Sequence, residues 1–371
     1  MSDDRGWLTD EYPELRSGPP WVMEEMILAE RDLPSAILDG AGEETAQVAA
    51  AIRDAVSLGA PIVVTGCGTS EHGAMAVAAL IGDAMPGAWV EAREALDAAV
   101  RPPRAGGLCI GISHDGGTRA TRLALEAARE AGAVTAAVTA HPATSVPEAA
   151  DYVVVTPFHD RSWCHTVAYA SAILAGAGIA GSGVPAARLT DLIDAVLACR
   201  PAIAEAARSI HGGRRILTAG LGADFVTARE LALKIEEGAR IPANAHRLET
   251  TLHGHLAGCD AESTALVRVA LDPAGGALAA ERATDLDAAL GVIGIPSVVL
   301  GEPLGLAPAG SVVEALLSGA VGLQLLTLEL AHAAGTNPDL IRREERAYRE
   351  AAAAAERSDS LENRRRSRRG P

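Results

Sequence analysis

Aromatic residues make up only 3% of the 371-residue sequence, although 49% of its residues are hydrophobic. A core must therefore be built from Ala, Val, Leu and Ile, whose small side chains suit helices packed closely on a buried parallel sheet. Excess positive charge is lacking as well, because the formal net charge is −16. This charge argues against an enzyme of nucleic acids, since phosphate backbones bind to basic surfaces.

The sequence also lacks a CxxC pair, an apolar run of 18 residues and an apolar signal core near its start. Its five cysteines are widely spaced, which is typical of reduced thiols and not of a disulfide framework or a zinc knuckle. Neither a membrane-spanning helix nor a secretory signal is predicted. We therefore expect a cytoplasmic protein.

Short apolar runs alternate with helical stretches of roughly 10–15 residues, a pattern typical of βαβ units and a parallel sheet. Strands are expected in residues 61–68, 89–94, 107–113, 133–140, 151–157, 214–223, 263–271 and 296–301. A strand, a glycine-rich turn, a helix, further strands and a closing helix occur in this order twice. The expected fold class is α/β, with two tandem lobes that each hold a parallel sheet between two layers of helices.

The chain divides into four expected segments. Residues 1–44 form an N-terminal arm and helix, residues 45–205 the first lobe, and residues 206–354 the second lobe. Residues 355–371 form a basic tail of low complexity, which we expect to be disordered.

The first glycine-rich turn, Gly66–Ser70, lies where an apolar run ends and a helix begins. Glycines allow a sharp turn, and the free N–H groups at the start of a helix attract anions. With the hydroxyls of Thr69 and Ser70, the turn suits a phosphate or a sugar hydroxyl. A dinucleotide site is disfavoured, because its GxGxxG motif needs a glycine where this sequence has Glu71. A tight turn without a ligand is the remaining alternative.

The second turn, Gly111–Thr118, follows another apolar run and precedes an amphipathic helix. In a doubly wound sheet both turns would lie at the carboxyl edge of the strands, where ligands bind. We therefore expect the two turns to share one site.

A third element is the stretch 224–241, which is expected to form one long helix. Lys234 and Glu237 are three residues apart and would share a face of this helix. An ordinary surface ion pair is the alternative interpretation. The residues that follow favour a site instead.

Residues 241–256 are expected to form a loop that carries His246, His253 and His255. A carboxylate, an amine and a histidine are the groups that an aldose–ketose interconversion needs. The histidine assists ring opening, the carboxylate moves a proton between C1 and C2, and the amine polarises the carbonyl or forms an imine with it. A metal site is disfavoured, because His253 and His255 are two residues apart and do not converge.

Together these motifs resemble the sugar isomerase (SIS) family, which includes the isomerase half of glucosamine-6-phosphate synthase. The resemblance runs from about Trp21 to Asp339 and is carried by GCGTS, ISHDGGTRAT, SWCHTVAYASAIL and LALKIEEGARIPANAHRLETTLHGHL. It implies catalytic roles for Lys234, Glu237 and His253. The residues that it implies as substrate contacts are Gly68, Thr69, Ser70, Ser113, His114, Asp115, Thr118, Trp163 and His165.

The resemblance also implies a sugar or sugar-phosphate substrate, no cofactor and no metal. It further implies a homodimer in which His253 of one subunit completes the site of the other. The synthase's glutaminase domain has no counterpart, and the second position, where that domain has a catalytic cysteine, is Ser2. Amination of a sugar would therefore need free ammonia or a separate glutaminase subunit.

Asp115 departs from the family pattern, which has a phosphate-binding serine at this position. Two like charges about 4 Å apart cost on the order of 1–4 kcal/mol near a surface. A protonated His114 would offset the charge, or Asp115 would turn away and cap the following helix. Alternatively, the substrate carries a hydroxyl or an amine here. Trp163 and His165 also stand where the family has small residues, which indicates a reshaped pocket.

The sequence thus favours a cofactor-free enzyme that acts on an amino sugar or a ketose, with a 6-phosphate as the expected substituent. Isomerisation, deamination or deglycation, and ammonia-dependent amination all stay open. A regulatory protein that binds a sugar phosphate without turnover is the main alternative. The presence of Lys234, Glu237 and His253 argues against it.

Overall fold

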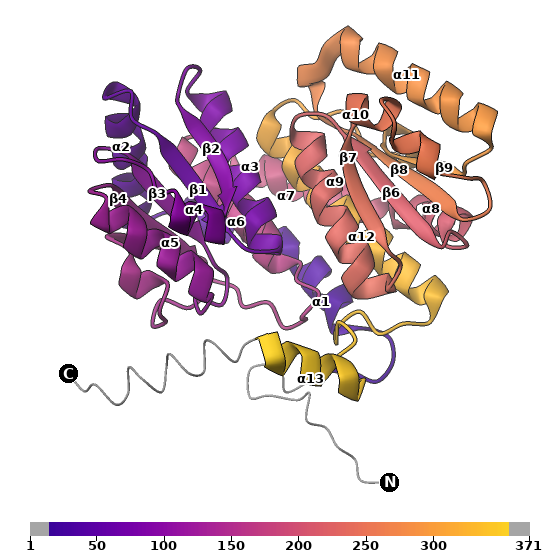
Figure 1. Cartoon of the computed structure of the whole chain (residues 1–371), viewed down its shortest axis with the longest axis horizontal. Helices are drawn as coiled ribbons and strands as arrows, with labels where there is room; N and C mark the ends of the chain where they lie inside the picture. Colours follow the sequence, from indigo (N-terminus) through magenta and orange to yellow (C-terminus); the bar gives the residue numbers. More distant parts are fainter. Residues whose placement is uncertain (1–14, 356–371) are drawn as a thin grey trace.

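The computed structural model describes residues 15–355 and contains two α/β lobes side by side (Figure 1). Residues 1–14 of the expected N-terminal arm, and residues 356–371 of the expected basic tail, lie outside the described residues. Each lobe has three layers, with a wholly parallel sheet between helices. This is the α/β class with tandem lobes that the sequence predicts.

The first lobe contains a five-stranded sheet in the order β2-β1-β3-β4-β5. Its strands are β1 (Ile62–Gly66), β2 (Val90–Glu94), β3 (Leu108–Ile112), β4 (Val134–Thr139) and β5 (Tyr152–Val155). One face is covered by α2 (Glu43–Ser57), α3 (Thr69–Ala84) and α6 (Val167–Ala180), and the other by α4 (Ala95–Val100) and α5 (Arg119–Glu130). Because β1 and β3 are buried on both faces, their sequences are continuous apolar runs.

The second lobe contains a four-stranded sheet in the order β7-β6-β8-β9. Its strands are β6 (Arg215–Gly220), β7 (Ala243–Arg247), β8 (Thr264–Ala270) and β9 (Ser297–Gly301). One face is covered by α8 (Arg200–Ile210), α9 (Ala223–Lys234) and α12 (Val312–Ala334), and the other by α10 (Leu248–Leu252) and α11 (Gly276–Ile293).

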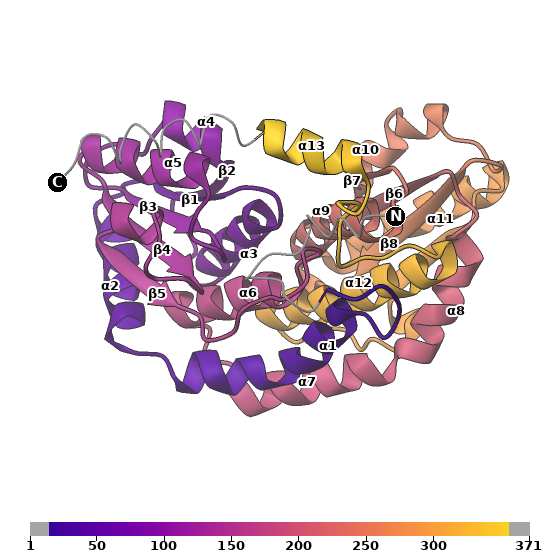
Figure 2. The same cartoon turned by 90° about the horizontal axis from the view of Figure 1, so that it is seen from below.

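Three further helices of the described residues lie outside these layers. They are α1 (Val22–Ala29), α7 (Ala186–Ala198) and α13 (Arg346–Ala355). In Figure 2, α1 and α7 lie on one side of the molecule and α13 on the opposite side. Short 3-10 turns occur at Glu30–Asp32, Pro147–Ala149, His255–Gly258, Pro273–Gly275 and Glu302–Leu304, and π turns at Ser35–Asp39 and Ile235–Ala239.

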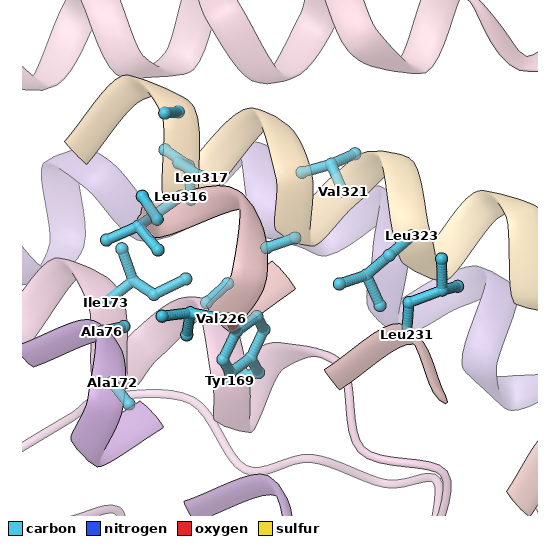
Figure 3. Packing of buried hydrophobic residues seen from close by; sticks show 14 of the residues in the cluster. Ala76, Tyr169, Ala172, Ile173, Val226, Leu231, Leu316, Leu317, Val321 and Leu323 are labelled. Carbon is cyan, nitrogen blue, oxygen red and sulfur yellow. The ribbon is translucent and has the colours of Figure 1, made fainter. Parts of the chain in front are cut away.

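The two lobes share one hydrophobic core, in which α3 and α6 pack against α9 and α12. Figure 3 shows this contact around Ala76, Ile173, Val226 and Leu316, one residue from each helix. Within residues 15–355, α12 alone is long and apolar enough to cross a membrane, and 89% of its most apolar window is buried inside the protein. It is therefore a core helix, and it holds the lobes together.

The second lobe differs from the sequence expectation in three places. The long helix expected over 224–241 ends as an α-helix at Lys234 and continues as a π turn. The expected loop 241–256 begins with strand β7, which contains His246 and pairs only with β6. Helix α11 was not expected, because its apolar pattern is weak and only Leu286 and Leu290 are buried.

Candidate functional site

The strand order of the first lobe brings two turns to one crevice. From β1 the chain goes to β2 on one side, and from β3 it goes to β4 on the other, so the order reverses between β1 and β3. Ligands bind outside the carboxyl ends of the strands at such a point. The turns 66–70 and 113–118 follow β1 and β3. Gly68 has a φ of 58°, a conformation that favours glycine and lets the chain enter α3 directly.

A cavity of about 220 Å³ lies at this crevice. Its lining residues are Cys67, Gly68, Thr69, Ser70, His114, Asp115, Thr118, Trp163, His165, Ala168, Glu237 and Ile341. Nine of the twelve residues that the resemblance implies are among them, and Ser113, Lys234 and His253 are not. Glu237 and Ile341 come from beyond the first lobe, so both halves of the chain build the cavity.

Lys234 is fully buried at the end of α9, behind Glu237. Its Nζ lies 2.6 Å from Glu237 Oε2 and 3.5 Å from Glu230 Oε1. Burial opposes the ammonium charge, but the carboxylates of Glu237 and Glu230 outweigh it and raise the pKa of Lys234 above its ordinary value. Glu230 is itself 2.6 Å from His72 Nδ1. The lysine is thus a charged ammonium in a buried network, and not a member of a surface ion pair.

The π turn Ile235–Ala239 brings Glu237 to the cavity wall. Such turns alter the direction of a side chain relative to the preceding helix and are frequent at functional sites. Gly238 fixes the turn against α12, because a Cβ at this position would lie 2.9 Å from Thr327 Cγ2. Glu237 keeps 23% of its side chain exposed, which leaves its carboxylate both held by Lys234 and open to a ligand.

Asp160 organises the histidines of the cavity. Its backbone N–H donates to His114 Nε2 at 3.0 Å, and its buried carboxylate accepts from the backbone N–H groups of Thr166 and Ala168. Burial lowers the pKa of His114 to about 4, so this ring is neutral near pH 7. Although burial opposes it, the Asp160 carboxylate raises the pKa of His165.

Asp115 has 43% of its side chain exposed at the cavity. Its Oδ2 lies 3.9 Å from His165 Nε2. Within residues 15–355, no hydrogen bond joins its carboxylate to the first turn of α5, which begins at Arg119 after an N-cap at Thr118. Two of the three explanations for Asp115 are thereby weakened, because it caps no helix and because His114 carries no charge to offset it.

His253 lies apart from the cavity of its own chain. Its side chain is 74% exposed, and Nε2 lies 2.8 Å from Glu249 Oε1. The ring of His255 stacks on that of His246 with centroids 3.9 Å apart. The histidine loop is therefore on the surface, and a single chain brings Lys234 and Glu237, but not His253, to the cavity. No group of three or more metal-binding side chains was found within residues 15–355.

Sequence reasoning did not single out Asp160, Glu230 or His72. Glu230 could have been found from the sequence, because it lies four residues before Lys234 on the same helix face. Asp160 acts mainly through backbone groups, which leave no motif. Lys234 carries a stronger signal than its spacing, because it is the only lysine in the sequence, and every other residue among the 32 Lys and Arg is arginine.

Comparison with known families now adds to this geometry. The SIS domain family matches residues 33–176, which run from the π turn before α2 to within α6. Residues 33–176 thus match a SIS domain. The crevice between β1 and β3 lies within these residues, and the second lobe repeats the same parallel architecture.

Solved structures share the SIS fold along most of the chain. The C-terminal domain of glucosamine-fructose-6-phosphate aminotransferase from Francisella tularensis is 18% identical with a TM-score of 0.72, over 87% of this chain and 99% of that domain. Tagatose-6-phosphate ketose/aldose isomerase from Escherichia coli is 18% identical with a TM-score of 0.72, over 86% and 95%. Glucosamine-6-phosphate deaminase from Thermotoga maritima is 17% identical with a TM-score of 0.69, over 86% and 96%. A search of curated protein sequences finds no significant match.

Proposed function

We propose that this SIS protein is an enzyme that opens a sugar ring and transfers a proton between C1 and C2. The substrate is a sugar or an amino sugar, or a phosphate of one, and no cofactor is needed. The observation that carries the proposal is the Glu237 carboxylate, which lines the cavity while the buried Lys234 ammonium holds it at 2.6 Å. Structural relatives named as isomerase, deaminase and aminotransferase of phosphosugars support it.

In the proposed reaction, Glu237 is the catalytic base. Its carboxylate takes a proton from one of the two carbons, the electron pair forms the C1–C2 double bond of an enediol, and the carbonyl oxygen takes up a proton from water. The same carboxyl group then returns its proton to the other carbon, while the hydroxyl on the first carbon becomes the new carbonyl and releases its proton to water. Lys234 is a positioning residue, because it touches Glu237 and lies outside the cavity lining. Its charged state disfavours imine formation, which needs a free amine.

The proposal assigns ring opening to His253 of a second copy of the chain. Within one chain this residue is exposed and does not line the cavity. A homodimer that brings the histidine loop over the neighbouring cavity would supply the missing acid. The nitrogen chemistry stays open between isomerisation, deamination or deglycation, and amination with free ammonia or a glutaminase subunit.

The test is proton exchange at C1–C2, followed by NMR in deuterated water with a panel of sugars and their 6-phosphates. Glu237→Gln should lower exchange roughly 10²- to 10⁴-fold, because it removes the general base. Glu236→Gln is the matched control, since Glu236 lies outside the cavity and its Oε1 only accepts from the Ala243 N–H at 3.2 Å. This control should keep wild-type exchange.

Full exchange in a folded Glu237→Gln protein would refute the mechanism. Binding of a sugar by the wild type without any exchange would instead favour a regulatory protein that binds sugars. The observation that favours this second function is the exposed position of His253, away from the cavity. Size measurement of the same samples, with His253→Ala as a variant, shows whether exchange requires the dimer.

A further inference from the structure

The end of the cavity around Asp115 has the wrong charge for a phosphate. We infer that this end takes a hydroxyl or ammonium group of an unphosphorylated sugar or amino sugar, and that Asp115 is the residue that selects it. The inference rests on the proposed function for the identity of the ligand as a sugar. It goes beyond that function by excluding the phosphate esters that the structural relatives are named for.

The lining of the cavity contains no lysine or arginine among the described residues. It contains two carboxylates, of Asp115 and Glu237. The Lys234 ammonium, 2.6 Å from Glu237, offsets the charge of that carboxylate from outside the lining and leaves Asp115 without a cation of its own there. Arg119 follows Thr118 without lining the cavity, and Arg343 lies over the Trp163 ring, 4.6 Å from its centroid, outside the lining.

The two histidines beside Asp115 offer no free positive charge. His165 lies between two carboxylates, with Nε2 3.9 Å from Asp115 Oδ2 and Nδ1 3.7 Å from Asp160 Oδ2. When this ring is protonated, those carboxylates already balance its charge. His114 uses Nε2 to accept from the Asp160 N–H, so it presents a neutral ring. Neither histidine leaves a positive charge for an anionic ligand.

Asp115 offers hydrogen-bond acceptors to a ligand in the cavity. Its carboxylate is partly exposed at the cavity and makes no hydrogen bond within residues 15–355, so it can still accept hydrogen bonds from a ligand. An ionised carboxylate accepts hydrogen bonds from hydroxyl or ammonium groups and repels a phosphate dianion. The Thr118 hydroxyl, which lines the cavity and lies 3.2 Å from the Ser113 hydroxyl behind it, can donate and accept, so it suits a sugar hydroxyl as well as a phosphate. Asp115 therefore decides between the two.

The test is calorimetric binding of matched ligand pairs. Glucosamine is compared with glucosamine 6-phosphate, fructose with fructose 6-phosphate, and inorganic phosphate is added as a third probe. The wild type should bind the unphosphorylated member of a pair at least tenfold more tightly and should not bind inorganic phosphate measurably. Asp115→Ser should shift the ratio at least tenfold toward the phosphate ester. Asp115→Asn, which keeps the shape but removes the charge, should shift it in the same direction.

Equal or tighter binding of the phosphate esters by the wild type would overturn the inference, and so would an unchanged ratio in both variants. A shift in Asp115→Ser alone would also overturn it, because shape and not charge would then be the cause. If neither pair binds, wild-type affinity for inorganic phosphate would refute the inference, and affinity gained only in both variants would support it. Melting temperatures check folding, which should not change because Asp115 is partly exposed and makes no hydrogen bond.

Binding and exchange separate this inference from the proposed function. Exchange with phosphate esters, together with tighter binding of them, would support the proposed function and refute only the inference about Asp115. A preference for unphosphorylated sugars without exchange would support the inference about Asp115 and refute the proposed function.

Discussion

The two lobes have the same backbone at their strand-order reversals but different side chains there. In the first lobe the turn after β1 contains Gly68 with φ 58° and ψ −128°, and in the second lobe the turn after β6 contains Gly222 with φ 58° and ψ −127°. Both turns start a helix at the carboxyl edge of a parallel sheet. The position that is Ser70 in the first lobe is Asp224 in the second.

The turn of the second lobe, which has Asp224 in place of Ser70, is closed. By this we mean that hydrogen bonds within the chain already use the polar groups around the turn. The Asp224 carboxylate accepts from the backbone N–H groups of Leu271 at 3.0 Å and Asp272 at 3.0 Å. In return, Asp272 Oδ2 accepts from the Ala223 N–H at 2.9 Å, at the start of α9. A cavity of about 350 Å³ lies beside these groups. However, the N–H donors of Ala223, Leu271 and Asp272 already bond to carboxylates of the chain itself. A repeated fold therefore keeps the geometry of a ligand site while its side chains decide whether a ligand can use it.

The strongest test of this comparison replaces the two matched residues. Asp224→Ala should destabilise the protein by on the order of 2–6 kcal/mol, because two backbone N–H groups lose their acceptor. Ser70→Ala should cost less than about 0.5 kcal/mol, since no hydrogen bond of its hydroxyl is found within residues 15–355. Urea unfolding at constant m-value measures both. Similar losses in the two variants would contradict the contrast between a closed and an open turn.

A second test uses pH. Burial raises the pKa of Asp224 to about 6 from 3.8, although the N–H groups of Leu271 and Asp272 oppose the shift. The folded state therefore holds this proton more tightly, so its contribution to stability is full below about pH 4 and is lost as the pH rises through about 6.

Asp224→Asn should remove that dependence. The unfolding free energy of the wild type minus that of Asp224→Asn should fall by on the order of 3 kcal/mol between about pH 4 and pH 7. Thermal unfolding of the two proteins across this range gives the difference. A constant difference would show that Asp224 is ionised in the folded protein throughout this pH range. Its hydrogen bonds to the N–H groups of Leu271 and Asp272 would then be accepted by a charged carboxylate.

A third test replaces the glycines themselves. Gly68→Ala should cost about 1–3 kcal/mol from backbone strain alone, because no heavy atom lies within 4 Å of a Cβ placed there. Gly222→Ala has the same strain, and its Cβ would also lie 2.7 Å from Asp272 Oδ2. It should therefore be the more destabilising of the two in chemical denaturation. The reverse order would mean that Asp272 moves aside readily and that the second turn is not closed.

Much of the fold followed from the sequence because buried parallel strands leave continuous apolar runs. The runs around β1, β3 and β6, each ending in glycine-containing turns, predicted the sheets and the ligand edge. The spacing of Lys234 and Glu237 likewise predicted their contact, which is 2.6 Å in the structure. Their roles in a reaction stay predictions.

Other features depend on contacts that no local pattern records. The π turn at Ile235–Ala239 follows from packing of Gly238 against Thr327, which is far along the chain. Strand β7 is an edge strand with weak alternation, so its pattern resembles a loop. The neutral state of His114 arises from burial and from the Asp160 N–H, neither of which is visible in the sequence. The segment boundaries and the homodimer also stay predictions.

The single lysine has a practical consequence. A protease that cuts only after lysine has one possible target in the 371 residues, the bond after Lys234, and this bond lies in the core between α9 and the π turn. Cleavage there requires opening of the second lobe, so its rate reports the population of opened molecules when opening is fast relative to cutting. Each cut gives the same two fragments, of 234 and 137 residues by the numbering of the sequence. The growth of the fragment bands on a gel thus reports how often the segment that contains Lys234 and the π turn with Glu237 opens.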